Sequence, residues 1–374
     1  MFEIIMDPNS YPFWIIVISV IALAVAVIFR PFSSYMKFVY PNAKYETIGN
    51  RYIKEKELNS IVETASIDSF KEKLNSSKDY EIKGNTSQEI QYSLDQNFKN
   101  TVVMMKKDSS KKMDKFFDTY LEKNDFYLIK KELKNRIVNN NVHDRSIDKV
   151  HFRENKKLLS RLKDAEKEEL PNILTDYGFP REIKEELSKE EIDFLILDKI
   201  IDRYYFDKML SVKVPYKCTK GKNQLIKRFI DINNIKNVLR AKQMDYKLEE
   251  ILKLFISEGF EIPKWKFEEI ADSDSVSQAI SALEGTSYYD PLKNSIDRYN
   301  EEKSVQIFEN ALDSIYLKLI KDISQDNYVT IGPTIRFLTG KEFEIRNLKV
   351  ISKGISDKLN SDLIKELLIM EGAS

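Results

Sequence analysis

Two histidines and one cysteine are the side chains in this sequence that most often carry catalysis or bind metals, and their spacing predicts neither. His143 and His151 lie eight residues apart in a charged stretch, and Cys218 is distant from both. A zinc site needs about four Cys, His or carboxylate ligands, so we interpret the histidines as solvated. One cysteine excludes an internal disulfide and fits a reducing compartment, and we expect Cys218 to be an incidental thiol.

The sequence has no phosphate-binding loop, and its paired carboxylates have a structural explanation. The segment CTKGKNQ, 218–224, lacks the first glycine and the final Ser/Thr of a phosphate-binding loop. Acidic runs beginning at Asp164 (DAEKEE) and Glu190 (EEIDF) contain paired carboxylates of the kind used in general acid–base catalysis. At this density of Glu and Lys we interpret them as ion-paired surface helices. We therefore predict no catalytic, cofactor-binding or metal-binding residue, and no cofactor.

The composition indicates a nearly all-α body without a nucleic-acid partner. Sixty Lys and Arg residues balance sixty Asp and Glu residues, whereas nucleic-acid-binding proteins normally carry a basic excess. The chain has only 10 Gly and 10 Pro in 374 residues, which is few for a protein of tight hairpins. The most basic short stretch, MKKDSSKKMDK at 105–115, either contacts anionic headgroups or is a solvated turn. We favour the solvated turn because acids are interleaved. Apolar residues at helical spacing form one-faced stripes, as in Val305, Phe308, Leu312, Ile315 and Leu319.

One apolar run near the start predicts a transmembrane helix. Residues 11–29 read YPFWIIVISVIALAVAVIF without a charge, and nineteen helical residues span about 28 Å, close to the hydrocarbon core of a bilayer. Glu3 and Asp7 precede the run, whereas Arg30 and Lys37 follow it. Positive charge stays on the cytoplasmic side, so we place the body in the cytoplasm at the cell membrane.

Two other interpretations of this run stay open. The small residues of ALAVA, 22–26, resemble a signal-peptide cleavage site, but acidic residues stand where a signal peptide has positive charge. A buried core helix suits a shorter run better. Ion relays need ionisable groups inside the membrane, and the run has none. We expect this helix to anchor or pack rather than to carry ions.

The body carries an internal repeat with a period near 110 residues. The segments NDFYLIKKELKNRI from Asn124, DINNIKNVLRAK from Asp231 and EIRNLKVISKGI from Glu344 align, and we place their acids near helix N-termini, where they complement the helix dipole. Three homologous helical lobes are expected, at 38–145, 146–259 and 260–374, after an N-terminal segment at 1–37. The polar stretch NNNVHDRS, 139–146, and Pro263 mark the boundaries. The positions in register are Asp125, Asp231 and Glu344, then Ile129, Ile235 and Leu348, then Lys130, Lys236 and Lys349.

A second echo supports the repeat. ASIDSFKEKLNSSKDY, 65–80, and SDSVSQAISALEGTSYYDPL, 273–292, each predict a short helix opened by Ser or Asp, a polar turn and an aromatic residue. The middle of the chain has only a blurred counterpart, LKDAEKEELPNILTDYGF from Leu162.

The motif YPNAKYETIGN from Tyr40, together with FIDINNIKNVLRAK and EFEIRNLKVISKGI, resembles the C subunit of archaeal A-type ATP synthases, the counterpart of the d (AC39) subunit of vacuolar ATPases. The resemblance covers residues 38–370. It implies an all-helical, funnel-shaped fold with three similar lobes after the transmembrane helix. Many such relatives begin near the YPNAK motif, so some forty residues are added here. The matching positions, which we interpret as structural, are Tyr40, Asn42, Ala43, Asn234, Lys236, Arg346, Asn347 and Lys349.

The resemblance implies a non-catalytic part of a proton- or sodium-translocating rotary ATPase. Such a subunit sits as a socket between the proteolipid rotor ring and the D- and F-type central-stalk subunits. It transmits torque, so that an ion gradient drives ATP synthesis. We hypothesise that the apolar helix enters the lipid-filled lumen of the ring, because a helix outside the ring would be dragged through bulk lipid. The alternative is a membrane-anchored helical scaffold or adaptor unrelated to ATP, and an enzyme of unknown type comes last.

Overall fold

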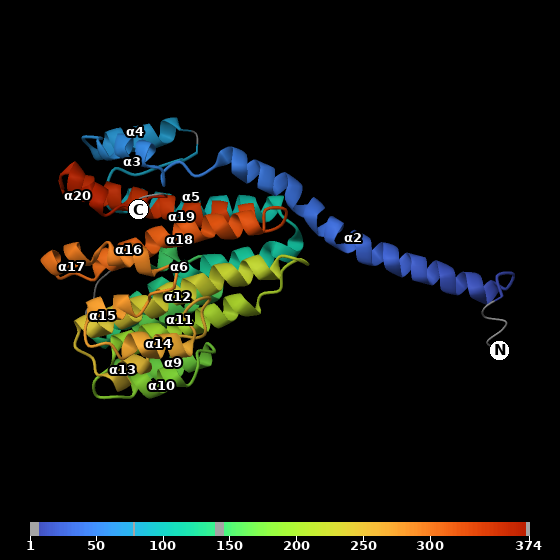
Figure 1. The fold of residues 1–374 in the computed structure, drawn as a ribbon. Coiled ribbons are helices and arrows are strands. Elements are labelled where there is room, and N and C mark those ends of the chain that lie inside the picture. Colours follow the sequence, from blue (N-terminus) through green and yellow to red (C-terminus); the bar gives the residue numbers. More distant parts are fainter. Residues whose placement is uncertain (1–6, 78, 139–145, 372–374) are drawn as a thin grey trace.

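A computed structural model describes residues 7–77, 79–138 and 146–371, and in these ranges the chain is helical without a β-strand. The expectation of an all-α protein is confirmed. Long helices lie side by side in the body, and shorter helices pack along their outer sides, mostly toward the end away from α2 (Figure 1). The short elements are α3 (Glu55–Val62), α4 (Ile67–Ser76), α7 (Ser146–Lys149), α8 (Arg153–Asp164), α9 (Leu170–Asp176), α10 (Glu182–Leu187), α13 (Leu248–Leu252), α14 (Lys264–Ala271), α15 (Val276–Ser281), α16 (Tyr289–Lys293), α17 (Ile296–Glu302), α20 (Ser361–Glu366), and the 3₁₀ turns η1 (Lys111–Met113) and η2 (Lys167–Glu169).

Helix α2 (Tyr11–Ile48) projects from the body and carries the apolar run (Figure 1). Its most apolar window has a mean hydropathy of 2.8 and is not buried at all, and among the described residues this helix alone is long and apolar enough to cross a membrane. The Ser10 side chain accepts a hydrogen bond from the first turn, and Gly49 ends the helix at φ 64°. The helix continues unbroken past residue 37, where the sequence places a domain boundary.

The C-terminal part of α2 is built into the body. Burial along the helix begins at Ser34 and continues through Phe38 and Tyr45. Pro31 and Pro41 lie inside the helix, where each removes one backbone donor from the hydrogen-bond ladder. The same continuous helix is thus bare over its apolar run and packed over its last four turns, so the body is held directly at the end of the run.

Three helical hairpins make the centre of the described body. They are α5 (Ser87–Asp108) with α6 (Asp114–Ile137), α11 (Phe194–Ser211) with α12 (Thr219–Gln243), and α18 (Gln306–Asp326) with α19 (Gly332–Ser356). The second helix of each hairpin also contacts the first helix of another: α6 contacts α11, α12 contacts α18, and α19 contacts α5. The contacts therefore close a circuit, and the hairpin turns lie at the end of the body from which α2 projects (Figure 1).

The core consists of two apolar clusters. The larger one fills the hairpins and the short helices α8 to α16. The smaller one joins residues from the two ends of the chain: Leu58, Phe70 and Leu94 pack with Leu348 and Ile364. The last long helix is therefore covered by short helices that come early in the sequence.

Candidate functional site

The acids of the sequence repeat are buried in the middle of long helices. Asp125, Asp231 and Glu344 are all 0% exposed and lie near the centres of α6, α12 and α19. Placing them near helix N-termini was wrong. They instead bind backbone groups of other segments, since a buried carboxylate must find hydrogen-bond donors.

Each of these carboxylates holds the segment that leads into a pair of short helices. Asp125 accepts hydrogen bonds from the backbone amides of His151 (2.8 Å) and Phe152 (3.1 Å) before α8. Glu344 accepts one from the amide of Tyr52 (2.7 Å) before α3. The equivalent Asp231 accepts bonds from three successive amides before α14, those of Phe260, Glu261 and Ile262, at 2.9 to 3.0 Å.

A tyrosine hydroxyl completes two of the three carboxylate sites. Tyr288 donates to Asp231 at 2.8 Å, and Tyr80 donates to Glu344 at 3.0 Å. These tyrosines are the aromatic residues that end the second sequence echo. Ser66 and Ser275 cap α4 and α15, as the echo predicts. Burial raises the pKa of Asp231 to about 6, although three amides and a hydroxyl donate to it.

At Asp125 the tyrosine's place is taken by a histidine. The His151 Nδ1 atom lies 3.1 Å from Asp125 Oδ1, and the His151 side chain is only 4% exposed. Describing His151 as solvated was therefore wrong, because the imidazole is needed next to a buried carboxylate. His143 and most of the stretch 139–146 lie outside the described residues.

The repeated lysines form ion pairs between hairpins. Lys130 Nζ on α6 lies 2.8 Å from Asp202 Oδ1 on α11, and Lys236 Nζ on α12 lies 2.7 Å from Asp313 Oδ1 on α18. Lys349 on α19 pairs in the same way with Asp95 on α5. Each lysine thus bonds the first helix of another hairpin, and the third pair joins the last long helix back to the first.

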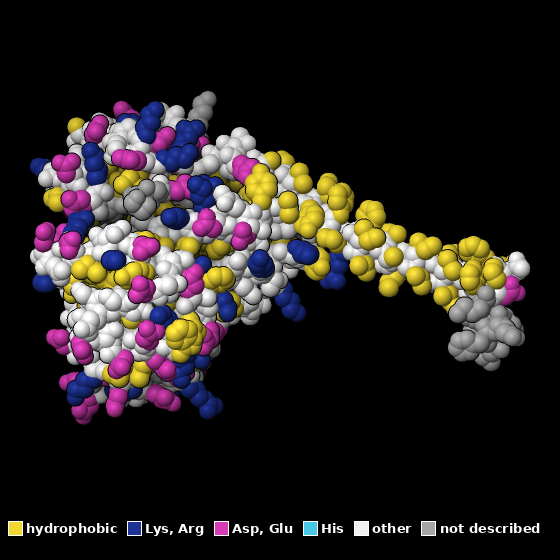
Figure 2. All heavy atoms as spheres, viewed as in Figure 1, with side chains coloured by type: hydrophobic (Ala, Val, Ile, Leu, Met, Phe, Trp, Pro, Cys, Tyr) yellow, Lys and Arg dark blue, Asp and Glu magenta, His cyan; other side chains and the backbone are white. Residues whose placement is uncertain are grey.

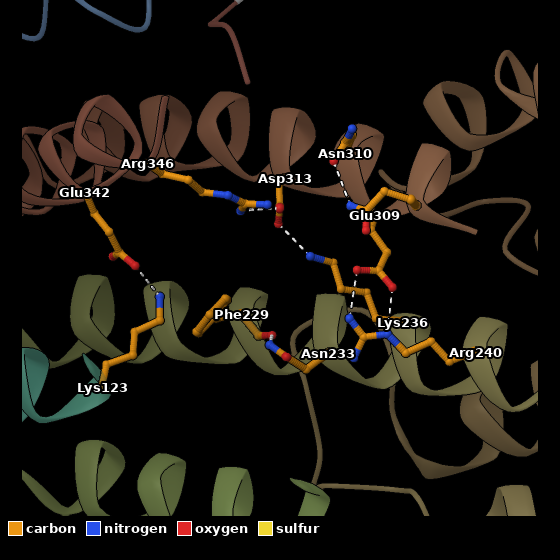
Figure 3. A network of polar contacts seen from close by, with 11 residues as sticks. Lys123, Phe229, Asn233, Lys236, Arg240, Glu309, Asn310, Asp313, Glu342 and Arg346 are labelled. Atoms are coloured by element: carbon orange, nitrogen blue, oxygen red, sulfur yellow. Dashed lines mark hydrogen bonds and ion pairs between the residues drawn. The ribbon is translucent and has the colours of Figure 1, made fainter. Parts of the chain in front are cut away.

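A further turn of helix adds a second pair to two of these interfaces. Lys134 Nζ lies 2.6 Å from Asp198 Oδ2, and Arg240 makes a two-pronged contact with Glu309 at 2.6 and 2.7 Å. Figure 3 shows the α12–α18 interface, where Asp313 also receives the Arg346 guanidinium at 2.5 Å. Burial acts to raise the pKa of Asp313, but Lys236 and Arg346 outweigh it and lower that pKa below its usual value.

The space between α6, α12 and α19 is filled by side chains one to two helical turns before the repeated lysines. Lys123 of α6 contacts the Glu342 carboxylate of α19 at 2.6 Å and lies 4.0 Å above the Phe229 ring of α12 (Figure 3). These three residues occupy the same repeat register, seven positions before Lys130, Lys236 and Lys349. A cavity of only about 10 Å³ remains beside them, close to the minimum that one water molecule needs.

Of the remaining predicted positions, the asparagines make hydrogen bonds inside the body and the other two are exposed. The Asn42 amide donates to the Thr330 carbonyl (2.8 Å) and accepts from Thr334, whereas Tyr40 and Ala43 are exposed. Asn234 accepts from the Ile256 amide at 3.0 Å, and Asn347 accepts from the Ile369 amide at 2.9 Å. Both asparagines therefore hold the segment 22 residues ahead. Burial raises the pKa of Cys218 to about 12, so its thiolate is scarce at neutral pH.

Sequence reasoning missed the acids that the lysines bind. Asp95, Asp202 and Asp313 recur at intervals of 107 and 111 residues, close to the intervals of 106 and 113 residues between the lysines. A search for acids at that period finds them. Among the described residues, no three His, Cys, Asp or Glu side chains are grouped so as to hold a metal ion. The arrangement fixes helices to one another by charge and hydrogen bonds.

The geometry defines a class of protein: an all-helical body of mutually bonded hairpins, carrying one long apolar helix at one end. Comparison with known proteins makes the assignment specific. The family model of the ATP synthase (C/AC39) subunit matches residues 41–367, and this chain belongs to that family.

Three curated relatives, each a C subunit of an A-type ATP synthase, align over most of the chain. The chain is 28% identical over 362 residues to the relative from Methanosphaera stadtmanae, covering 95% of this chain and 94% of the relative. It is 28% identical over 352 residues to that of Methanobrevibacter smithii (91% and 89%) and 28% identical over 344 residues to that of Pyrococcus horikoshii (89% and 90%).

The first alignment corrects one expectation. It leaves out 5% of the 374 residues of this chain, which is about 19 residues, so it reaches into the apolar run. The expectation that some forty residues are added in front does not hold for the Methanosphaera relative.

Proposed function

We propose that this chain is the non-catalytic rotor-socket subunit of an archaeal A-type (V/A-type) ATP synthase. It couples the membrane rotor ring to the central stalk, so that an ion gradient drives ATP synthesis. The observation that carries the proposal is the closed circuit of ion-paired hairpins in a member of this family. A part that passes torque must not shear internally, and each of the three interfaces between hairpins is held by at least one ion pair.

Its architecture on this proposal is three homologous lobes arranged as a funnel, with 38–145, 146–259 and 260–374 as the sequence ranges. Three kinds of repeated contact support it: the buried acids, the asparagines and the lysine–aspartate pairs. The short helices held by Glu344 come from the first range, so the lobes interlock across the chain ends. That interlocking favours a rigid socket over three independently moving lobes.

In the assembly, helix α2 crosses the membrane and the body stays on the cytoplasmic side. The partners are the proteolipid subunits of the ring, the D- and F-type stalk subunits, the rest of the complex and membrane lipid, with no nucleic acid. We place α2 in the lipid-filled lumen of the ring, because the body rotates with the ring. Photocrosslinking from Val17 or Ala24 tests this placement. Crosslinks to stator-side subunits or outer lipids contradict it.

A membrane-anchored scaffold unrelated to ATP is the alternative, and family membership weighs against it. The deciding experiment is a mild-detergent pull-down of the full-length tagged chain, with mass spectrometry and an ATPase assay. Recovery of ring and stalk subunits with ATPase activity supports the socket. Recovery of the chain alone, or with unrelated membrane proteins, supports the scaffold. Turnover of a substrate by the isolated chain makes it an enzyme instead.

A further inference from the structure

The base of α2, residues 30–48, contacts each of the three hairpin turns of the body. Asn42 bonds the carbonyls of Tyr328 and Thr330 in the α18–α19 turn. Lys44 pairs with Asp108 at the α5–α6 turn, at 2.7 Å. On the α11–α12 turn, the Tyr216 ring lies 4.5 Å below the Arg30 guanidinium. The end of the body that bears these turns therefore faces whatever medium α2 enters.

The turns lie at the depth of the lipid headgroups if the apolar run spans a bilayer. The run ends at Phe29, and the first buried residue of α2 is Ser34, five residues further on. Five helical residues rise about 8 Å. The headgroup layer on each side of a bilayer is roughly 5–8 Å thick, so Tyr216 and its neighbours reach it. Exposed Tyr216 and Tyr328 suit this layer, where amphipathic rings are favoured.

This end of the body is rich in exposed basic side chains. Residues 208–230 contain no acid, and Lys213, Lys217 and Lys220 in this stretch are exposed. Lys111 and Lys112 on the α5–α6 turn and Lys37 on α2 are also exposed. Dark blue Lys and Arg side chains flank the base of α2, beside its apolar surface (Figure 2). The acids at this end are Asp108, which pairs with Lys44, Glu46, which accepts a hydrogen bond from the Tyr328 hydroxyl, and Asp114 and Asp326.

We propose that this surface, the three hairpin turns around the base of α2, binds the headgroups of anionic lipids. The inference rests on the membrane-spanning role proposed above for α2. The sequence alone favoured a solvated turn at 105–115. The structure adds a second basic turn, 212–218, and the adjacent apolar helix. Each Lys or Arg near an anionic surface favours binding by about fivefold at moderate salt, so several together give marked lipid selectivity.

The test uses the full-length chain in vesicles of phosphatidylcholine, with or without phosphatidylglycerol. The buried Cys218 does not compete for labelling, so a fluorophore is placed through S211C, at the turn-bearing end. The matched control is S281C on α15, because each serine hydroxyl bonds a carbonyl one turn earlier. Quenching by headgroup-spin-labelled phosphatidylglycerol is compared with quenching by the same label on phosphatidylcholine. Flotation measures insertion separately.

At S211C we expect labelled phosphatidylglycerol to be enriched at least fivefold over phosphatidylcholine, and S281C to be quenched by neither. The triple variant K213E/K217E/K220E loses this enrichment yet still floats with the vesicles. The control K247E/K253E/K293E, at the two ends of α13 and on α16, keeps it. If both lipids quench equally, or if the enrichment survives in K213E/K217E/K220E, the turns do not bind anionic headgroups, but α2 can still span the membrane. A chain that does not float with either vesicle overturns the membrane-spanning role of α2 as well.

Discussion

Removing the carboxylate of Asp313 is the sharpest test of the ion-paired circuit. The Asp313 side chain is 5% exposed and contacts Lys236, which is 13% exposed, and Arg346, which is 46% exposed. In D313A the Arg346 guanidinium can turn to water, but the buried Lys236 ammonium loses its ion-pair partner and keeps only the nearby Glu309 carboxylate, which Arg240 already binds. Stranding one charge of a buried pair costs about 3–5 kcal/mol, so we expect the free energy of unfolding to fall by that amount.

A variant that replaces both partners separates the ion pair from general packing. K236M/D313L replaces both partners by apolar groups of similar size, and such replacements of buried pairs are often neutral. We therefore expect the double variant to be more stable than D313A. Urea unfolding of the full-length chain in detergent, followed by circular dichroism, measures each stability. R298A is the control, because Arg298 and Glu366 are both about half exposed and such pairs contribute about 0–1 kcal/mol.

The three lysine–aspartate pairs can be ranked by the stability that the removal of each acid should cost. Side-chain exposure is 18% and 25% for Lys130 and Asp202, and 29% and 18% for Lys349 and Asp95. The cost of removing the acid should therefore be largest for D313A and smaller for D202A and D95A. The ion pair does not stabilise the fold if D313A lowers the free energy of unfolding no more than R298A does, or if K236M/D313L is as unstable as D313A.

Single residues give further tests. The pKa of Asp231 is raised from 3.8 to about 6, so between pH 4 and 6 the folded state binds a proton that the unfolded state has lost. As pH rises through this window, the wild type should therefore lose up to about 3 kcal/mol of stability relative to D231N. Parallel pH profiles of the two proteins would contradict this. G259A should cost about 1–3 kcal/mol or more, because a Cβ there would lie 1.7 Å from Asp231 Oδ1, whereas G285A, whose added Cβ meets no atom within 4 Å, should show only the strain of its positive φ. N42A should cost about 1–3 kcal/mol by leaving the buried Thr330 carbonyl of the α18–α19 turn without its Asn42 donor. Unchanged thermal melting would show that the YPNAK motif does not hold that turn.

The sequence predicted the class of fold and the register of the site. Few Gly and Pro, apolar stripes and the uncharged run of 11–29 were sufficient for an all-helical body with one apolar helix. The register of Asp125, Asp231 and Glu344 came from the repeat alone, and the caps Ser66 and Ser275 came from residue type, because capping is a local property.

The partners of the repeated residues could not be predicted, because they are distant in the chain. Lys349 binds Asp95, which lies 254 residues earlier, and Glu344 binds the amide of Tyr52. Helix periodicity gives the face on which a residue lies but not which helix covers that face. The environment of His151 was missed for the same reason. Its charged neighbours in sequence suggested solvent, whereas a carboxylate 26 residues earlier draws it into the interior.

We infer that this chain couples rotation without taking part in ATP chemistry. The most direct measurement reconstitutes the complete ATP synthase in vesicles with and without this subunit, then compares gradient-driven ATP synthesis with ATP hydrolysis. We expect that omitting the subunit abolishes synthesis while the catalytic part still hydrolyses ATP, and that adding the chain back restores synthesis. The coupling role would be wrong if gradient-driven synthesis persists without the subunit, or if omitting the subunit also abolishes hydrolysis.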